Sequence, residues 1–338
     1  MRKLSLKILL VVGSIFLIGL LITNYNYYYG ESSTLKLCMD EARDENTNYD
    51  FVILGSSTAY SSYSTEIIDN RLGVNSLNLG SEFQLVCDSN EILKDYLKYN
   101  NPKYIVFEVD PYYFWSDYSY IDTMSNSTTN VLPALKPSFN KMKYTCEMMI
   151  RRPELAKDFI TYSVNPKRLM APYESNYNWG EFEADESYIM THKGDKLYTA
   201  VLDEATLKAA SAGFPMDYSM GWDYLEKFVA SAKDSGAELI FVTSGPTDAY
   251  VESCGTWEEI HNGFAEAAEK AGAKYYDFTY AKPELWDKDI TDWADNVHLN
   301  AQGAIKVTNA LCDVIEADNT DRYFYSDYQT YTENAKIK

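Results

Sequence analysis

The stretch that decides the fold is Phe51-Val52-Ile53-Leu54-Gly55-Ser56-Ser57-Thr58-Ala59-Tyr60. Its first four residues are apolar, as in a short strand that is buried on both faces. Gly55 then allows the chain to turn sharply, and Ser57 follows that turn. Ligands of open parallel sheets bind outside the carboxyl ends of the strands, so a serine here is placed for use as a nucleophile. The alternative is a Gly-Ser turn that only caps the next helix.

Outward from this stretch, strand and helix patterns alternate along the chain. Short apolar runs bounded by turn signals predict four more strands, at 74–79, 104–109, 239–243 and 274–278. Helical spacing predicts helices at 89–99, 222–233, 256–272 and 302–317, the third of them opened by a capping box from Thr256 to Glu259. This alternation is typical of an α/β fold, here with a five-stranded parallel sheet covered on both faces.

Residues 112–215 break this alternation with a segment rich in Tyr, Asn and Ser. We interpret it as a large insertion after the third strand, with its clearest ordered piece at 142–169. Because it leaves the carboxyl end of that strand, we expect it to wall the cleft, with Tyr112, Tyr113 or Trp115 nearest the site. The alternative is that the insertion packs on a distant flank and adds only stability.

Charge and composition disfavour several classes of function. The 338 residues include 30 Lys and Arg against 50 Asp and Glu, a formal net charge of −20. Without a basic excess to neutralise phosphates, nucleic acid is not an expected partner. The five cysteines lack the C-x-x-C spacing of redox and zinc sites, and there are three histidines. We therefore expect no metal and no cofactor.

The N-terminus indicates membrane attachment. The run from Ile8 to Ile22 is almost wholly apolar, and Arg2, Lys3 and Lys7 precede it. Basic residues on this side predict a single-pass signal-anchor with the rest of the chain outside the cytoplasm. A cleaved signal peptide is the alternative. The expected division is an anchor at 1–30, a juxtamembrane spacer at 31–49, the main domain at 50–317 and a tail at 318–338.

A second chemical motif precedes the last predicted helix, in Asp295-Asn296-Val297-His298-Leu299-Asn300. A serine nucleophile needs a base to take its proton, and that base needs a partner that holds its tautomer. Asp295, three residues before His298, can orient the imidazole within one turn of chain. Ser57, His298 and Asp295 therefore form a candidate catalytic triad.

Taken together, these blocks resemble the SGNH (GDSL-like) hydrolase superfamily, in particular its membrane-anchored bacterial branch, which is polysaccharide O-acetyltransferase-like and DltD-like. The first block matches 51–60, the second matches 78–80 and the last matches 295–300, within a resemblance covering 50–110 and 218–315. The resemblance implies a flavodoxin-like three-layer sandwich without a metal. It also implies that Ser57 is the nucleophile and that the Gly80 amide serves the oxyanion hole.

The chain departs from the family pattern at two positions. Ser56 stands where an aspartate usually precedes the nucleophile. Asp110 stands where the third block has an asparagine, and an ionised carboxylate cannot donate to an oxyanion. We expect the hole to consist of the Ser57 and Gly80 amides with a side chain such as Gln84, and Asp110 to lie at the substrate.

The function expected from these residues is that of an extracytoplasmic acyl-ester hydrolase or O-acyltransferase acting on a cell-surface glycan. Its expected partners are the membrane, a glycan-linked acyl ester or acyl donor, and a membrane-bound protein that supplies the acyl group. Two alternatives are a DltD-like role in teichoic-acid D-alanylation and a non-catalytic binding or assembly protein on a decayed fold.

Overall fold

The computed structural model describes residues 33–111, 114, 130–151, 186–203 and 219–334, and parts of the N-terminal segment between residues 7 and 27. The described elements run in the order α2 (Thr34–Glu41), β1 (Phe51–Leu54), α3 (Ser57–Ser62), α4 (Thr65–Leu72), β2 (Ser76–Asn78), α5 (Val86–Tyr96), β3 (Tyr104–Glu108), α8 (Phe139–Arg151), β4 (Tyr188–Met190), β5 (Lys196–Tyr198), α12 (Ser219–Ser235), β6 (Glu238–Thr243), α13 (Asp248–Cys254), α14 (Trp257–Ala271), β7 (Lys274–Asp277), η3 (Phe278–Tyr280), η4 (Ile290–Asp292), α15 (Ala301–Glu316), η5 (Asp321–Tyr323) and α16 (Tyr328–Asn334).

Five strands form one all-parallel sheet in the order β2-β1-β3-β6-β7, with a large insertion after β3. The predicted α/β, flavodoxin-like fold is confirmed, and each of the five strands lies within a residue or two of its predicted range. The register pairs Leu54 of β1 with Phe107 of β3, and Thr243 of β6 with Asp277 of β7. The carboxyl ends of these strands therefore meet at one edge of the sheet.

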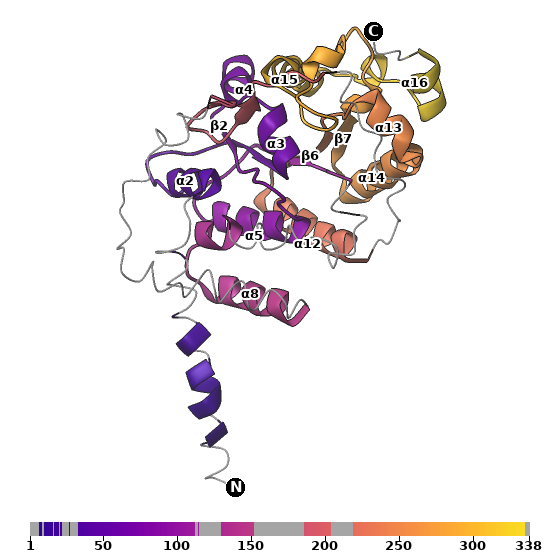
Figure 1. The fold of residues 1–338 in the computed structure, drawn as a ribbon. Helices are drawn as coiled ribbons and strands as arrows, with labels where there is room; N and C mark the ends of the chain where they lie inside the picture. The colour runs from indigo at the N-terminus through magenta and orange to yellow at the C-terminus, as the bar shows by residue number, and fades with distance from the viewer. Residues whose placement is uncertain are drawn as a thin grey trace.

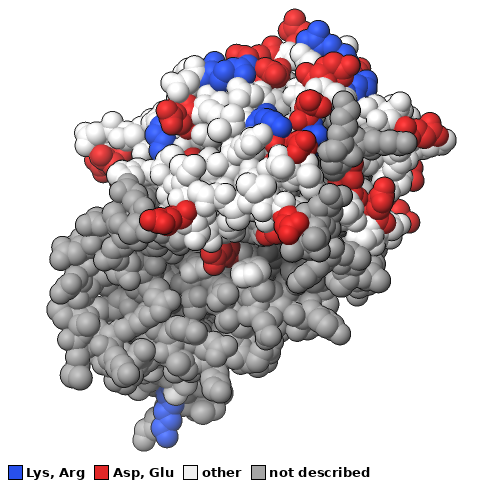
Figure 2. Space-filling view, turned by 45° about the horizontal axis from the view of Figure 1, so that its top comes forward, with Lys and Arg blue, Asp and Glu red and all other residues white. Residues whose placement is uncertain are grey.

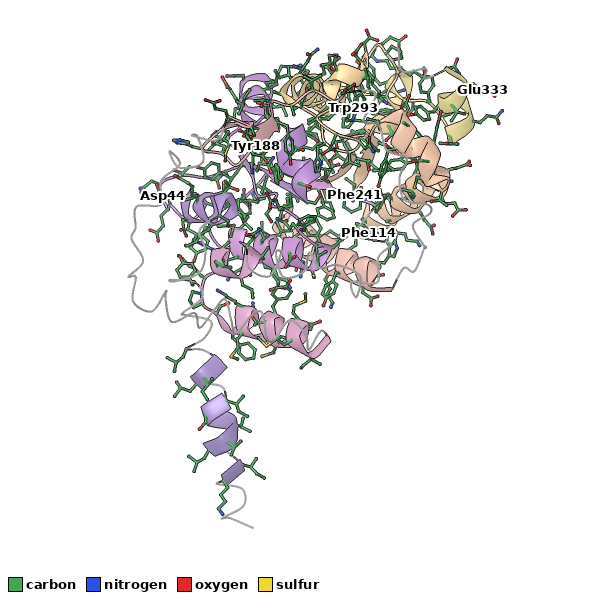
Figure 3. The ribbon with its side chains drawn as sticks, viewed as in Figure 1. Asp44, Phe114, Tyr188, Phe241, Trp293 and Glu333 are labelled. Carbon is green, nitrogen blue, oxygen red and sulfur yellow. The ribbon has the colours of Figure 1, made fainter. Side chains whose placement is uncertain are left out.

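The sheet is buried on both faces because alternate side chains of each strand enter different cores. Val52 and Leu54 pack with α5, α12 and α14, whereas Phe51 and Ile53 pack with α4 and α15. Figure 1 shows the sheet between these two helical layers, and Figure 3 shows the side chains that fill them, with Phe241 of β6 near the middle. Full burial of such a side chain stabilises the fold by about 1.5–3 kcal/mol.

The start of α14 corrects one sequence prediction. Thr256 is its N-cap, but no capping hydrogen bond forms from the Thr256 side chain. The hydroxyl instead donates to the Cys254 carbonyl at 3.5 Å. The preceding helix α13 ends at Gly255 in a left-handed conformation, and this short link takes Thr256 out of the extended geometry of a capping box.

Two described pieces of the insertion pack on the domain. Phe114 is buried against Trp222 of α12 and Phe264 of α14, at ring-centroid distances of 5.1 and 4.8 Å. Strands β4 and β5, which the sequence patterns did not reveal, form an antiparallel hairpin beside α3. Figure 3 labels Tyr188 of this hairpin. Tyr112, Tyr113 and Trp115 lie outside the described residues, as does 152–169 of the ordered piece expected at 142–169.

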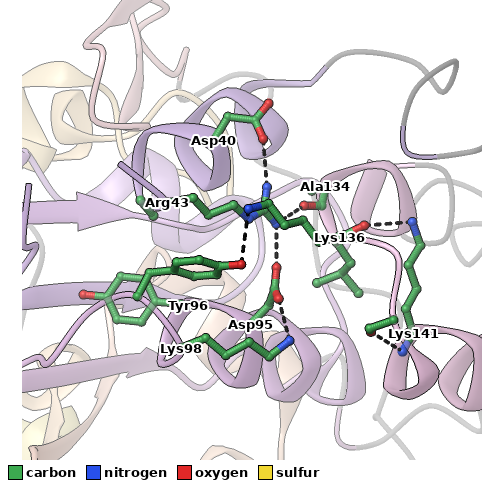
Figure 4. A network of polar contacts seen from close by, with 12 residues as sticks. Asp40, Arg43, Asp95, Tyr96, Lys98, Ala134, Lys136 and Lys141 are labelled. Atoms are coloured by element: carbon green, nitrogen blue, oxygen red, sulfur yellow. Dashed lines mark hydrogen bonds and ion pairs between the residues drawn. The ribbon is translucent and has the colours of Figure 1, made fainter. Parts of the chain in front are cut away.

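The segment expected as a juxtamembrane spacer belongs, from residue 33 onward, to the folded domain. Leu35 and Met39 of α2 are fully buried in the core. Arg43 is paired with Asp40 at 2.8 Å and with Asp95 of α5 at 2.5 Å, and it donates to the Ala134 carbonyl (Figure 4). Removing one partner of such a buried pair costs about 3–5 kcal/mol. This network ties α2, α5 and the insertion together, so the segment is not a free linker.

The two ends of the chain differ in their packing. The tail after residue 318 packs on the domain through a bridge between Phe324 and Ala281 and through the buried ring of Tyr331. The described apolar side chains between Ile8 and Leu21 are more than half exposed. The expected anchor at 1–30 lies largely outside the described residues. Within the described part of the chain, no helix combines the length and apolar character needed to cross a membrane.

Candidate active site

The turn after β1 presents Ser57 at the carboxyl edge of the sheet. Gly55 has a φ of 144°, and a Cβ on it would meet the Glu108 Cβ at 2.8 Å. Only glycine satisfies both this backbone and this approach. Ser56 caps α3 in an extended conformation, and Ser57 is the first residue of the helix. The turn at Gly55 and the cap at Ser56 together determine where the Ser57 side chain lies after the end of β1.

The second half of the site is a tight loop held at the start of α15. Asn300 accepts from the amides of Gln302 and Gly303 and donates to the carbonyls of Thr291 and Trp293. The amide of Ala294 donates to the His298 carbonyl at 2.8 Å. Apolar residues at helical spacing bury one face of α15 against the sheet, so the loop has a rigid base.

The structure brings the three expected triad residues together. His298 Nε2 lies 2.8 Å from Ser57 Oγ, and His298 Nδ1 lies 2.8 Å from Asp295 Oδ2. Asp295 Oδ1 also accepts from the amides of Val297 and His298, each at 2.9 Å. With Nδ1 donating to the carboxylate, Nε2 is left as the acceptor facing the serine hydroxyl.

The electrostatics of Asp295 suit the orienting role. Burial would raise the pKa of this carboxyl, but the hydrogen bond from His298 and the two backbone amides hold it below its usual value. Asp295 therefore stays ionised near neutral pH, as a carboxylate that orients a histidine requires. Its side chain is 54% exposed and that of His298 is 18% exposed, so the solvent screens part of this interaction.

Ser57 and His298 open into a cavity of 290 Å³ at the ends of β3 and β6. Its apolar lining includes Phe83, Pro246 and Trp257, and its polar lining includes Glu108 and Asp110. Trp257 is almost fully buried, and its indole N–H has no hydrogen-bond partner among the described residues. A cavity of this size, mainly apolar with a few polar groups beside a serine hydroxyl, is typical of a site for a small ligand.

Glu108 is a functional candidate that sequence reasoning missed. It ends β3, is almost fully buried, and accepts from the Tyr63 hydroxyl at 2.6 Å and from the Ser244 amide at 2.8 Å. Burial raises the pKa of this carboxyl to about 8 despite these hydrogen bonds. The sequence did not reveal this residue, because a single Glu at the end of an apolar strand belongs to no recognisable motif. Its burial depends on Tyr63 and Ser244, which come from other elements.

The two residues that depart from the family pattern contact each other. Ser56 Oγ donates to Asp110 Oδ2 at 2.9 Å and lies 3.0 Å from Thr58 Oγ1. Because serine has one hydroxyl hydrogen, the Thr58 hydroxyl supplies the hydrogen of the second contact. Asp110 lines the cavity, as expected for a residue at the substrate, and it also links the end of β3 to the turn that carries Ser57.

The structure corrects the expected oxyanion hole. The Gly80 amide donates to Asn78 Oδ1 at 2.9 Å. Both hydrogens of Gln84 Nε2 are used, one on the Leu79 carbonyl and one on Ser81 Oγ. Neither Gly80 nor Gln84 lines the cavity, because each satisfies buried groups of its own loop. Of the expected oxyanion donors, only the backbone N–H of Ser57 is left to bind an oxyanion. Ser57 is in the first turn of α3, and the amides of a first turn have no acceptor within their own helix.

Tyr198 of β5 is a second residue that the sequence patterns missed. Its ring centroid lies 5.3 Å from that of His298, and its hydroxyl is 3.4 Å from the hydroxyl of Tyr60. Burial, with nearby acidic groups that include Asp295, raises the pKa of Tyr198 to about 12, so the hydroxyl stays protonated. Lys196 lies on the same strand, with Nζ 3.7 Å from the ring centroid of Tyr188. The β4–β5 hairpin thus lies beside the histidine.

Charged side chains of both signs are mixed on the surface of the molecule. Figure 2 shows one face of the molecule on which Lys and Arg are interspersed with Asp and Glu instead of forming one basic patch. In the described residues there is no group of three His, Cys, Asp or Glu side chains arranged to hold a metal ion. The five cysteines are free thiols, four buried and Cys146 exposed.

The protein has an α/β fold with a five-stranded parallel sheet. At the carboxyl edge of this sheet, His298 is within hydrogen-bond distance of Ser57 on one side and of Asp295 on the other. No protein-family model matches the chain, and no curated protein matches its sequence.

Proposed function

We propose that this protein is a serine-dependent acyl-ester hydrolase or O-acyltransferase of SGNH type, with a cell-surface glycan as its substrate. The observation that carries the proposal is the 2.8 Å contact between Ser57 Oγ and His298 Nε2, with Asp295 on the opposite ring nitrogen. Each partner occupies the position that nucleophile, base and orienting carboxylate require.

The reaction follows from these positions. Ser57 Oγ attacks the acyl carbonyl carbon while His298 Nε2 takes the hydroxyl proton. The imidazolium, stabilised by Asp295, then gives this proton to the leaving alcohol oxygen, and the acyl group stays on Ser57 as an ester. A water molecule or a sugar hydroxyl attacks the acyl-serine next, and His298 accepts its proton and returns it to Ser57 Oγ. Water completes a hydrolysis, and a sugar completes a transfer.

Three features support acyl chemistry on a glycan. The cavity beside Ser57 accommodates a small acyl group, and the Ser57 amide is available to the developing oxyanion. The rings of Tyr198 and Tyr188 lie 4.9 Å apart beside His298, where a sugar leaving group or acceptor would stack. The apolar N-terminal run with its basic flank supports attachment to the membrane, where an envelope polymer would be within reach.

A second candidate function is a non-catalytic binding or assembly role on the same fold. It is favoured by the engaged amides of Gly80 and Gln84 and by Asp110 in place of a donor. Losing one oxyanion donor costs on the order of a hundredfold to a thousandfold in rate. A DltD-like role in teichoic-acid D-alanylation is a narrower version of the acyl-transfer proposal, and the acidic chain disfavours a polyanionic partner.

The test is labelling of the purified protein with a fluorophosphonate probe, which reports an activated serine without knowledge of the substrate. We expect the label on Ser57, lost in Ser57→Ala. Ser61→Ala is the matched control, because Ser61 lies on the same helix and its buried hydroxyl has no partner in the part of the chain that the structure describes. Absence of label on the parent protein, or label that persists in Ser57→Ala, would decide for the non-catalytic role.

A further inference from the structure

A second cavity, of 430 Å³, lies between β7, α14 and the C-terminal segment, apart from the cavity that Ser57 lines. Five aromatic side chains contribute to its walls: Tyr275, Tyr276, Tyr280, Phe324 and Tyr325. The last two come from the tail, which is fixed by the Ala281–Phe324 bridge and by the Tyr325 amide donating to the Tyr280 carbonyl at 2.9 Å. The tail therefore builds a wall of this cavity.

The polar groups in this cavity form a histidine–aspartate pair. His261 Nδ1 lies 2.9 Å from Asp277 Oδ2, and Asp277 Oδ1 accepts from the Thr279 amide at 2.9 Å. Asp277 is almost fully buried, and the His261 ring stacks on Tyr280 with centroids 4.3 Å apart. With Nδ1 held by the carboxylate, Nε2 is the ring nitrogen left for a ligand.

The two cavities are neighbours across a single pair of strands. Thr243 of β6 lines the first cavity, Tyr275 of β7 lines the second, and their hydroxyls lie 3.1 Å apart. Trp257 and His261, one turn apart on α14, line the first and second cavities respectively. Four residues of an α-helix rise about 6 Å along its axis. The two cavities therefore share a wall built by β6, β7 and α14.

We propose that the second cavity is a saccharide subsite that holds a neutral pyranose ring of the glycan whose ester is placed at Ser57. Aromatic faces suit the C–H faces of a sugar, while polar lining residues such as His261, Thr320 and Ser326 suit its hydroxyl groups. A purely apolar acyl chain would leave these polar groups unpaired. A phosphate would meet Lys282 in this cavity, but also the carboxylates of Asp277 and Asp321. The link to Ser57 rests on the proposed function, whereas binding of the sugar itself does not.

The experiment is saturation-transfer difference NMR on the full chain with cellohexaose, chitohexaose and mannohexaose, followed by titration of the hexasaccharide that gives signal. We expect one of them to bind, and Tyr325→Ala and His261→Gln each to raise its Kd about tenfold or more. Tyr328→Ala is the matched control, because this tail tyrosine does not line the cavity, and its Kd should equal that of the parent. The fluorophosphonate label on Ser57 should be unchanged in all three variants.

The outcomes separate the two proposals. Signal from none of the three hexasaccharides, or a Kd unaffected by both Tyr325→Ala and His261→Gln, overturns the subsite. If Tyr325→Ala fails to fold, His261→Gln decides, since His261 is a partly exposed helix residue. Sugar binding that depends on these residues, in a protein whose Ser57 takes no label, would support the subsite while rejecting the catalytic proposal.

Discussion

The ring of Tyr198 in the insertion lies 5.3 Å from the imidazole of His298, centroid to centroid, with the planes inclined by 50°. The contact is anchored by a parallel bridge between Tyr198 and Asn300, the residue that caps α15. A described part of the insertion therefore reaches the histidine that faces Ser57. That residues 112–215 wall the cleft remains a prediction, because Tyr112, Tyr113 and Trp115 lie outside the described residues and no described residue of the insertion lines the cavity beside Ser57.

Removing the Tyr198 ring should weaken binding of the sugar part of a substrate. We expect Tyr198→Ala to raise KM for an acetylated oligosaccharide up to about tenfold, since an aromatic stacking contact contributes roughly 0.5–1.5 kcal/mol. Tyr198→Phe, which keeps the ring, should stay close to the parent. Ile189→Ala is the control, because Ile189 lies on the same hairpin and is 52% exposed. Equal KM values for Tyr198→Ala and Ile189→Ala would contradict the role of the ring.

Asp295→Asn should lower turnover by roughly a hundredfold to ten-thousandfold while leaving the fold intact. An amide at this position can donate to His298 Nδ1, so the proton moves to Nε2 and the base is lost. Stopped assays on p-nitrophenyl acetate measure the effect, and thermal unfolding checks the fold. The control is Asp287→Asn at an exposed site in the same acidic region. Turnover of Asp295→Asn within a fewfold of the control would exclude the triad.

Glu108 should make the protein less stable as the pH rises. Its folded pKa of about 8 lies above the ordinary value of 4.5, so between these values the folded chain holds a proton that the unfolded chain has lost. Stability from this group is full below about 4.5 and is lost as the pH approaches 8, at up to about 1.4 kcal/mol per pH unit. Urea unfolding at pH 5 to 8 should therefore show a flatter profile for Glu108→Gln. Parallel profiles for the parent and the variant would refute this titration.

The N-terminal segment should hold the protein on the membrane. We expect the full chain to stay in the membrane fraction after carbonate extraction, and a chain that starts at residue 31 to be released. Protease added from outside should digest residues beyond Thr23 in intact cells. A mature N-terminus at residues 24–30, found by N-terminal sequencing, would show cleavage and contradict a retained anchor.

The order of the five sheet strands and of four helices could be predicted because each of these elements carries its own local signal. The run 51–54 is continuously apolar, and the run 302–317 repeats apolar residues at helical spacing. The hairpin β4–β5 escaped prediction because its strands are three residues long and only partly buried. The capping box at Thr256 failed because a side-chain cap depends on the backbone that enters the helix, which α13 and Gly255 determine here.

By itself, the sequence determined the parallel α/β architecture, the serine at the end of the first strand and the pairing of Asp295 with His298. All three depend on periodicity or on spacing within a few residues. Only the tertiary structure decided what surrounds them. It placed His298 against Ser57 across the sheet edge, put Tyr198 beside the imidazole and buried Glu108. It also gave the Gly80 backbone amide and the Gln84 side-chain amide hydrogen-bond acceptors within their own loop, and it placed the C-terminal tail beside His261 and Asp277. These outcomes depend on contacts between segments that are distant in sequence. They also depend on which acceptor each buried donor binds. The spacing of residues within one segment determines neither the contacts nor the choice of acceptor.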